Sequence, residues 1–468
     1  METRAERRNR AKRFLVVCIT AMLVLLLTGM QTAVSFAASE PPETQCDGVL
    51  LYDQKTGEVL YEKNADEPMT PASITKIMTA VLVLENVENL DEEVTITEEM
   101  LFPLGNNMDL QVGEVLTVRQ LLNVLLVYSA NDAAVALAVH VGGSEEAFVD
   151  MMNAKAAEIG AEHTHYLCPN GFSESWDHVT TPRDLKIIAD YACGVEGFTD
   201  ITSQSSVKVP ATNKHEAREY KSTNQLLYDD ETTIYVNGEE RTPKYDGVFG
   251  IKTGMMGNAG YCLVAGCERD SMRLVAVCLR GDNELDRFED SIALFDWAYA
   301  NYETVQLVEP GMKCGKVKVR GGHKVKMNAY CEEGVLVTRD ISGGADENAE
   351  ESDEEDYEIV LYDDVEAPLA AGDQVGYISY VKADGTEAQA PVVVREDDRE
   401  GGPWTKIYIS DFHFWAGVIM VAIVAVPLLL GSLARRKTAK RGQTRSQRYA
   451  QTGSAGSRRK NQKKRRRR

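Results

Sequence analysis

Three common signatures of hydrolytic and nucleotide-binding enzymes are missing from this sequence. It contains no Gly-x-Ser-x-Gly elbow, no His-Glu-x-x-His pair and no phosphate-binding glycine loop. These absences exclude the usual α/β-hydrolases, zinc peptidases of that motif and P-loop nucleotide enzymes. Histidine is scarce, with seven residues, and its one cluster, His163-x-His165, has no carboxylate or cysteine at ligand spacing. We therefore expect neither a metal nor a cofactor.

The cysteines form no Cys-x-x-Cys pair. One of the nine, Cys18, lies in an N-terminal apolar run, and eight remain in the rest of the chain, at positions 46, 168, 193, 262, 267, 278, 314 and 331. An exported protein can pair such cysteines, but the spacing does not define which thiols pair.

The N-terminus has the pattern of an export signal. Six basic residues among the first thirteen precede an almost wholly apolar run at 14–27, and Ser35-Phe36-Ala37 offers small residues where signal peptidase cleaves. Because the run is shorter than the ~20 residues that span a bilayer, we predict a cleaved signal over residues 1–37. The alternative is an uncleaved anchor helix.

A second apolar run, 414–433, has no charge. Trp415 stands at its outer edge, and Arg435, Arg436 and Lys437 follow it. This pattern predicts a single-pass transmembrane helix after a linker at 397–411, with a cytoplasmic basic tail at 434–468. The alternative for 414–433 is a buried core helix. We expect the tail to lie against anionic lipid, although it could also bind nucleic acid or a cytoplasmic partner.

The charge is divided unevenly along the chain. The net charge is −21; the tail contributes +16 and the first thirteen residues +4, which leaves −41 for the residues between. Such an acidic surface does not bind nucleic acid or anionic polymers non-specifically. The two ends together predict a protein of the cell membrane whose main part faces outward.

Between the ends, two domains follow one another. Residues 45–300 mix helix and strand signals and predict an α+β domain. Its expected strands are a hairpin at 48–62 and single strands at 260–266 and 273–279. Its expected helices are 75–84, 115–127, 133–141 and 287–299, with a further helix start at Thr181-Pro182-Arg183-Asp184. Residues 303–396 alternate short apolar runs with glycine turns and predict a small all-β domain. Eight acids in 346–356 predict a solvated loop there rather than a calcium site.

Three short motifs remain after the eliminations: Ser-x-x-Lys, Ser-x-Asn and Lys-Thr-Gly. Each occurs more than once, the first starting at Ser73, Ser205, Ser379 and Ser457. Context favours Ser73, because it precedes an apolar helix whose first turn has unpaired N–H groups that can stabilise an oxyanion. Lys76 is three residues on and shares its helical face. Burial of Lys76 lowers its pKa, so that the amine can accept the serine proton.

The other two motifs have a preferred copy as well. Ser129-Ala130-Asn131 lies at the junction of two apolar helices, where it either projects polar groups into a cleft or merely caps the second helix. A further Ser-x-Asn starts at Ser222. Lys252-Thr253-Gly254 follows a strand-like run, and its cation, hydroxyl and small glycine suit a docking carboxylate. The Lys55 copy sits in a tight turn and is structural.

In this order the motifs resemble the penicillin-binding, serine-type D-alanyl-D-alanine carboxypeptidases of low molecular weight. The resemblance extends to Met69–Lys76, Tyr128–Ala134 and Gly250–Gly254, then to 148–154 and 259–265, and covers roughly residues 45 to 396. It implies a serine β-lactamase/transpeptidase-like catalytic domain, an antiparallel sheet with a helical cluster. It also implies an enzyme that removes the terminal D-alanine from peptidoglycan stem peptides.

The resemblance also implies catalytic roles. Ser73 attacks the penultimate D-alanine carbonyl to form an acyl-enzyme, and Lys76 takes its proton. Ser129 relays a proton to the leaving D-alanine, and Asn131 holds the substrate amide. β-lactams should acylate Ser73 as substrate mimics.

Substrate binding is implied for the third motif. Lys252, Thr253 and Gly254 receive the terminal carboxylate, and the backbone N–H groups of Ser73 and Met255 form the oxyanion hole. Met255 and its neighbours depart from the more polar residues usual after this motif, and 228–245 has the character of an insertion that could form a lid. Both departures bear on specificity.

Three other functions share part of the pattern. A β-lactamase usually needs a second base in a Glu-x-x-x-Asn setting, which is absent between Asn131 and Lys252. A D,D-endopeptidase acting on cross-links uses the same residues and is the closest alternative. A catalytically inactive wall-binding scaffold is disfavoured because the key residues of all three motifs are intact: Ser73, Lys76, Ser129 and Lys252.

Overall fold

The structure is a computed structural model that describes residues 40–342, 357–382, 385–401 and 417–433. The predicted signal at 1–37, the acidic loop at 346–356 and the tail at 434–468 lie outside these residues, as do 402–411 of the linker. The described chain divides into two compact units. One contains the residues up to 312 together with 331–359 and 378–390, and the other contains 313–330, 360–377 and the residues from 391 onward.

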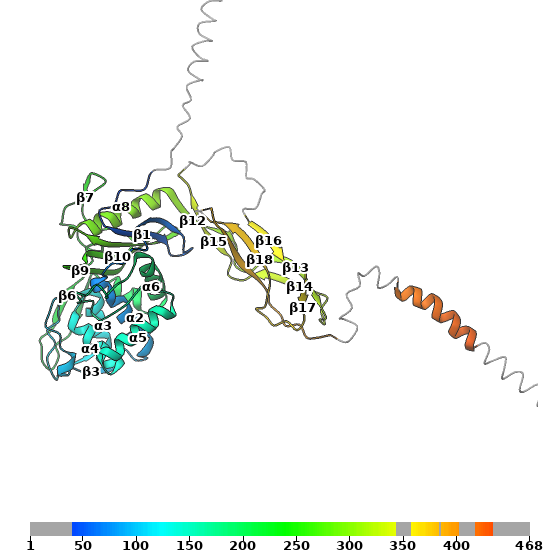
Figure 1. The fold of residues 1–468 in the computed structure, drawn as a ribbon, viewed down its shortest axis with the longest axis horizontal. Helices are drawn as coiled ribbons and strands as arrows, with labels where there is room; N and C mark the ends of the chain where they lie inside the picture. The colour runs from blue at the N-terminus through cyan, green and yellow to red at the C-terminus, as the bar shows by residue number, and fades with distance from the viewer. Residues whose placement is uncertain (1–39, 343–356, 383–384, 402–416, 434–468) are drawn as a thin grey trace, which may run out of the picture. The chain divides into compact units, whose positions relative to one another are not determined.

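A five-stranded antiparallel sheet forms the centre of the first unit (Figure 1). Its strand order is β2-β1-β11-β10-β9, and its strands are β1 (Gly48–Asp53), β2 (Val59–Lys63), β9 (Val248–Met256), β10 (Gly260–Arg269) and β11 (Met272–Gly281). The predicted hairpin and the two predicted strands are therefore confirmed. Strand β9 lies at an edge, so one row of its backbone groups has no neighbouring strand.

Helices cover both faces of this sheet (Figure 1). One side holds a cluster of α2 (Lys76–Asn86), α3 (Val118–Val127), α4 (Asn131–Gly142), α5 (Glu145–Glu158), α6 (Pro182–Gly194) and α7 (Phe198–Thr202), and the other holds α8 (Asp286–Asn301). Three short 3-10 turns are η1 (Ala72–Thr75), η2 (Glu98–Met100) and η3 (Gln225–Leu227). The first nine residues of α4 are all buried, as expected for a helix that is apolar all round.

One predicted boundary is wrong. The helix expected from residue 115 begins at Val118, and β4 (Val115–Thr117) pairs instead with β3 (Glu93–Thr95). The reason is a capping box at Thr117. Its side chain accepts from Gln120 N, and the Gln120 side chain accepts from Thr117 N, which fixes the helix start.

Two hairpins extend from the first unit: β5 (Ser206–Val209) with β6 (Arg218–Lys221), and β7 (Ile234–Val236) with β8 (Glu239–Arg241). The second belongs to the predicted insertion at 228–245. It is fastened to α8, because Tyr235 N donates to Glu289 and Arg241 pairs with Asp296 at 2.7 Å. Of the insertion's described residues only Tyr228 lines the cleft that contains Ser73, so the hairpin is a packed side element rather than a lid.

The region after α8 is built from strands. They are β12 (Tyr302–Val308), β13 (Met312–Arg320), β14 (Lys326–Cys331), β15 (Val335–Asp340), β16 (Tyr357–Leu361), β17 (Val365–Glu366), β18 (Gln374–Val381) and β19 (Glu387–Val394). Strands β12 and β15 pair, and the others form a six-stranded sheet in the order β16-β18-β19-β14-β13-β17. This agrees with the prediction of an all-β region.

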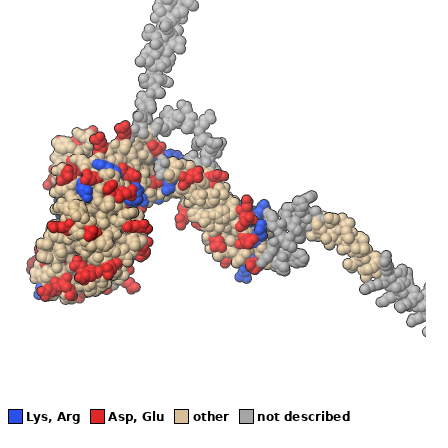
Figure 2. All heavy atoms as spheres, viewed as in Figure 1, with Lys and Arg blue, Asp and Glu red and all other residues tan. Residues whose placement is uncertain are grey.

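The described part of the second apolar run, 417–433, is helical and exposes its apolar side chains. Among the residues that the structure describes, no helix combines the length and the apolar character needed to cross a bilayer. In the view of Figure 2, acidic side chains far outnumber basic ones on the first unit, in keeping with the charge calculated from the sequence.

Candidate active site

Ser73 stands in the turn that leads into α2, and its hydroxyl meets Lys76. Lys76 Nζ lies 2.7 Å from Ser73 Oγ and also donates to Asn131 Oδ1 at 2.8 Å and to Asn170 O at 2.6 Å. Ala72 has a φ of +48°. This backbone conformation is unfavourable for a residue with a Cβ, and residues that adopt it are concentrated at functional sites. The turn therefore aims the hydroxyl at the lysine.

The electrostatic state of Lys76 follows from its burial. The residue is fully buried, and desolvation lowers its pKa to about 7, although Cys168 and Asp132 nearby act in the opposite direction. An amine with this pKa is substantially neutral at neutral pH. It can then act as a base toward the hydroxyl beside it.

The turn Ser129-Ala130-Asn131 joins α3 to α4 and faces the same cleft. The N-cap position of α4 is Ala130, with no side-chain cap hydrogen bond, and the Asp132 carboxylate accepts from Ala133 N in the first turn at 2.9 Å. Ser129 has a φ of +71°. Asn131 accepts from Lys76 and donates through Nδ2 to Leu104 O at 2.8 Å, which joins the second motif to the first.

Lys252, Thr253 and Gly254 lie on the edge strand β9. Lys252 is 1% exposed, and burial together with the nearby Lys76 and Arg287 lowers its pKa well below the usual value. A Cβ added at Gly254 would lie 3.0 Å from Pro71 O, so glycine permits the strand to approach the turn that carries Ser73. The Lys55 copy lies in the turn between β1 and β2, outside the cleft.

Several residues of the cleft were not anticipated, and two of them contact the third motif. The Thr223 hydroxyl hydrogen-bonds the Thr253 hydroxyl, and Arg287, at the start of α8, donates to Gly254 O at 2.9 Å. Thr223 belongs to the second Ser-x-Asn copy, whose recurrence was a usable signal. No short motif marks Arg287, because it reaches the cleft only through the packing of α8 on the sheet.

A loop after α5 forms the floor of the site. Gly171 has a φ of +75°, and a Cβ there would lie 1.9 Å from Ala72 O, so only glycine fits. His178 accepts from Leu167 N through Nδ1 and meets the Thr75 hydroxyl through Nε2 at 2.8 Å. Burial lowers the pKa of His178 to about 4, which keeps it neutral in this structural role.

Part of this set lines a cleft of about 560 Å³, whereas Lys76 and Lys252 are buried and are not among its lining residues. Its lining includes Ser73, Asn106, Ser129, Asn131, Phe172, Glu174, Thr223, Tyr228, Thr253, Gly254, Met255, Tyr261, Glu284 and Arg287. Met255 is 61% exposed and offers an apolar contact beside the polar groups. A hydroxyl beside a buried amine, with the basic side chains of Lys252 and Arg287 nearby, can transfer an acyl group from a substrate that ends in a carboxylate. The fold and cleft thus define a serine acyl-transfer enzyme.

Comparison with known families agrees with this class. Residues 35–283 match the family described as D-alanyl-D-alanine carboxypeptidase, and residues 302–400 match the C-terminal domain of penicillin-binding protein 5. The chain therefore belongs to the D-alanyl-D-alanine carboxypeptidase family. It is a serine-type D-Ala-D-Ala carboxypeptidase and a low-molecular-weight penicillin-binding protein, with a transpeptidase-like domain followed by an all-β domain.

Individual relatives span most of the chain. D-alanyl-D-alanine carboxypeptidase DacF of Bacillus subtilis is 30% identical over 388 residues, covering 81% of this chain and 93% of its own. DacC of Escherichia coli is 29% identical over 400 residues, with coverage of 82% and 93%. The crystal structure of penicillin-binding protein 5 from Haemophilus influenzae aligns with a TM-score of 0.64 at 27% identity, covering 77% of this chain and 99% of that one.

Proposed function

We propose that Ser73 is the nucleophile and Lys76 the general base of this carboxypeptidase, and that the substrate is a peptidoglycan stem peptide ending in D-Ala-D-Ala. The observation that carries the proposal is the 2.7 Å approach of Lys76 Nζ to Ser73 Oγ at a fully buried amine. An exposed lysine is protonated at neutral pH and cannot accept the serine proton, whereas this one can.

The reaction proceeds in two halves. Ser73 Oγ attacks the carbonyl carbon of the penultimate D-alanine while its proton passes to Lys76 Nζ. The oxyanion is held by the backbone N–H groups of Ser73 and Met255. The C–N bond then breaks, Ser129 relays the proton to the departing amine, and D-alanine leaves. Water, deprotonated by Lys76, attacks the ester carbonyl. The bond to Ser73 Oγ then breaks, Lys76 returns the proton to Oγ, and the shortened peptide leaves with a free carboxylate.

The substrate is held at both ends of the scissile bond. The terminal carboxylate lies against Lys252, Thr253 and Gly254, and the buried guanidinium of Arg287 adds positive charge on that side. Asn131 hydrogen-bonds the substrate amide while its carbonyl orients Lys76. Because β9 is an edge strand, the peptide can pair with its free backbone groups in the manner of an added strand.

Carboxypeptidase action is favoured over cleavage of cross-links, because the two relatives described above are both named carboxypeptidases. This chain aligns with more than nine tenths of the length of each. β-lactams mimic the substrate: their ring amide opens as Ser73 Oγ bonds to the carbonyl carbon. The resulting ester is the covalent mark of the proposed nucleophile.

Residues 45–300 form the catalytic domain and 303–396 the β-rich domain in this proposal, outside the cell membrane. A single helix at 414–433 anchors them, with 434–468 in the cytoplasm. The support is the row of exposed apolar side chains in the helical segment, such as Ile419, Val421 and Leu428 at 55%, 67% and 68% exposure. A helix surface of this kind is stable in lipid rather than in water.

The test is D-alanine release from a peptide ending in D-Ala-D-Ala, measured for the purified protein and for Ser73→Ala. The proposal predicts release by the parent and none by the variant. A cross-linked dimer peptide in the same assay tests the endopeptidase alternative. Release of D-alanine by Ser73→Ala at the parent rate would remove Ser73 from the mechanism.

A further inference from the structure

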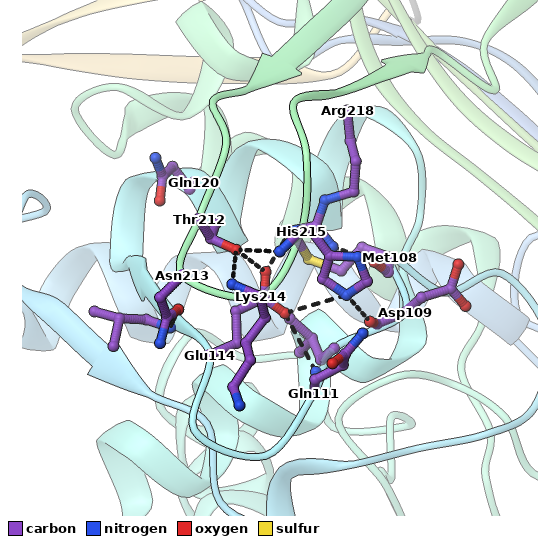
Figure 3. Close-up of polar contacts among 12 residues, drawn as sticks. Met108, Asp109, Gln111, Glu114, Gln120, Thr212, Asn213, Lys214, His215 and Arg218 are labelled. Atoms are coloured by element: carbon purple, nitrogen blue, oxygen red, sulfur yellow. Dashed lines mark hydrogen bonds and ion pairs between the residues drawn. The ribbon is translucent and has the colours of Figure 1, made fainter.

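Glu114 is a carboxylate buried away from the catalytic cleft. It precedes β4 and is fully buried, and its oxygens accept from Arg218 Nη2 at 2.6 Å, Thr212 Oγ1 at 2.9 Å and Gln111 N at 3.2 Å (Figure 3). A buried charge persists only when it is paired and hydrogen-bonded. Here Arg218 and Thr212 belong to the hairpin of β5 and β6, about a hundred residues further along the chain.

The same hairpin holds the loop that precedes Glu114. Arg218 donates through Nη1 to Met108 O at 2.7 Å, and His215 Nε2 lies 2.8 Å from Asp109 O (Figure 3). The guanidinium therefore spans the Glu114 carboxylate and the Met108 carbonyl with two separate nitrogens. A lysine, with one compact ammonium, does not reproduce this fork.

On its other side the loop holds the second catalytic motif. Asn131 donates from its backbone to Asn106 O at 2.7 Å and from Nδ2 to Leu104 O at 2.8 Å. Met108 N donates to the Asp132 carboxylate at 3.0 Å. Met108 thus contacts Arg218 through its carbonyl and the start of α4 through its amide, and the loop connects Arg218 to Asn131.

The hairpin also leads into the opposite wall of the cleft. After β6, Ser222 N donates to Ser205 O at 2.8 Å and Thr223 N donates to Val127 O at 3.0 Å. The Thr223 hydroxyl then meets Thr253. Glu114 and Arg218 therefore join the two segments that position Asn131 on one side and Thr253 on the other.

We propose that the Glu114–Arg218 ion pair positions the site for acylation, by fixing the loop that holds Asn131 and, through Asn131, the amine of Lys76 beside Ser73. This inference rests on the proposed roles of Ser73 and Lys76. Neither member of the pair touches substrate; both act through the backbone of the loop. Small displacements of a catalytic group have large effects on rate, on the order of a hundredfold for 1 Å.

The experiment uses a fluorescent penicillin and stopped-flow kinetics to separate the dissociation constant of the non-covalent complex from the acylation rate constant. The variants are Glu114→Gln and Arg218→Lys, and the matched control is Glu219→Gln, which breaks the exposed Lys208–Glu219 pair on the same hairpin. We expect acylation to slow by about tenfold or more in Glu114→Gln and less in Arg218→Lys, which keeps the cation. Non-covalent affinity should change less than about twofold, and the control should match the parent.

Melting curves are recorded for the same variants. If the ion pair had only a structural role, its loss would lower the melting temperature without slowing acylation. Lower melting temperatures with parent-like acylation rates in both folded variants would overturn the proposal. Should Glu114→Gln fail to fold, the rate of Arg218→Lys decides the question by the same criterion. A failure of the proposed function gives a different result. In that case the parent protein is not acylated, or the Ser73→Ala variant is acylated.

Discussion

The buried amine of Lys76 makes acylation depend on pH in a defined direction. Desolvation brings its pKa to about 7, so that about half of the lysine is neutral at pH 7. A lysine with the ordinary pKa of about 10.4 would be neutral in only about 0.04% of molecules at that pH. Burial therefore increases the neutral fraction of Lys76 by roughly a thousandfold.

The assay is the acylation rate constant for a chromogenic penicillin at a series of pH values. Raising the pH removes the proton from Lys76 and activates it, so the rate should rise from about pH 5 and level off near pH 8, with its midpoint at about pH 7. Lys76→Arg should lose about a thousandfold or more at pH 7, because a guanidinium stays protonated. Lys186→Arg, a change to a lysine paired with Asp190 on α6, is the matched control and should follow the parent.

Two results would refute this reasoning. One is an acylation rate in the parent that does not change between about pH 5 and about pH 9. The other is a folded Lys76→Arg variant that is acylated at the parent rate, since a permanent cation cannot accept the serine proton. Either result would mean that another group activates Ser73.

Three further predictions follow from the site and the C-terminal segment. Thr223→Val removes the hydroxyl that contacts Thr253 and should raise KM for a D-Ala-D-Ala peptide about fivefold with little change in kcat; an unchanged KM would show that the contact does not shape carboxylate binding. Gly105→Ala should slow penicillin acylation at least about tenfold, because φ is +73° and the new Cβ would lie 2.5 Å from Asn131 Nδ2; parent-like acylation would contradict it. Deletion of residues 414–468 should move the enzyme from the membrane fraction to the soluble fraction on cell fractionation, whereas retention in the membrane would place the anchor elsewhere.

The local parts of this molecule were accessible from its sequence. Ser73 and Lys76 are three residues apart before an apolar helix, so one turn of chain brings them together. The strands of the sheet could be predicted from apolar runs such as 260–266 and 273–279, because their alternation and turns are local signals. The start of α3 was missed, since the Thr117 capping box competes with the apolar pattern of 115–127.

The long-range parts of the site were not accessible. Arg287 lies far from Ser73 in sequence and reaches the cleft only because α8 packs as it does. Thr223 was marked only by the second Ser-x-Asn copy, and its contact with Thr253 depends on the packing beside β9. The sequences around Glu114 and Arg218 do not distinguish these two residues from ordinary solvent-exposed charges, so their pairing could not be predicted. The insertion at 228–245 was suggestive of a lid, yet Tyr235 and Arg241 fasten it to α8. Such contacts depend on tertiary packing that no local pattern encodes.

The central claim is that Ser73 forms a covalent acyl-enzyme. The most direct test is mass spectrometry of the protein after a brief incubation with penicillin, followed by proteolysis and sequencing of the modified peptide. The account predicts one added penicilloyl group per chain, located on Ser73, and no addition to Ser73→Ala. A label on another serine, or an unmodified parent protein, would contradict it.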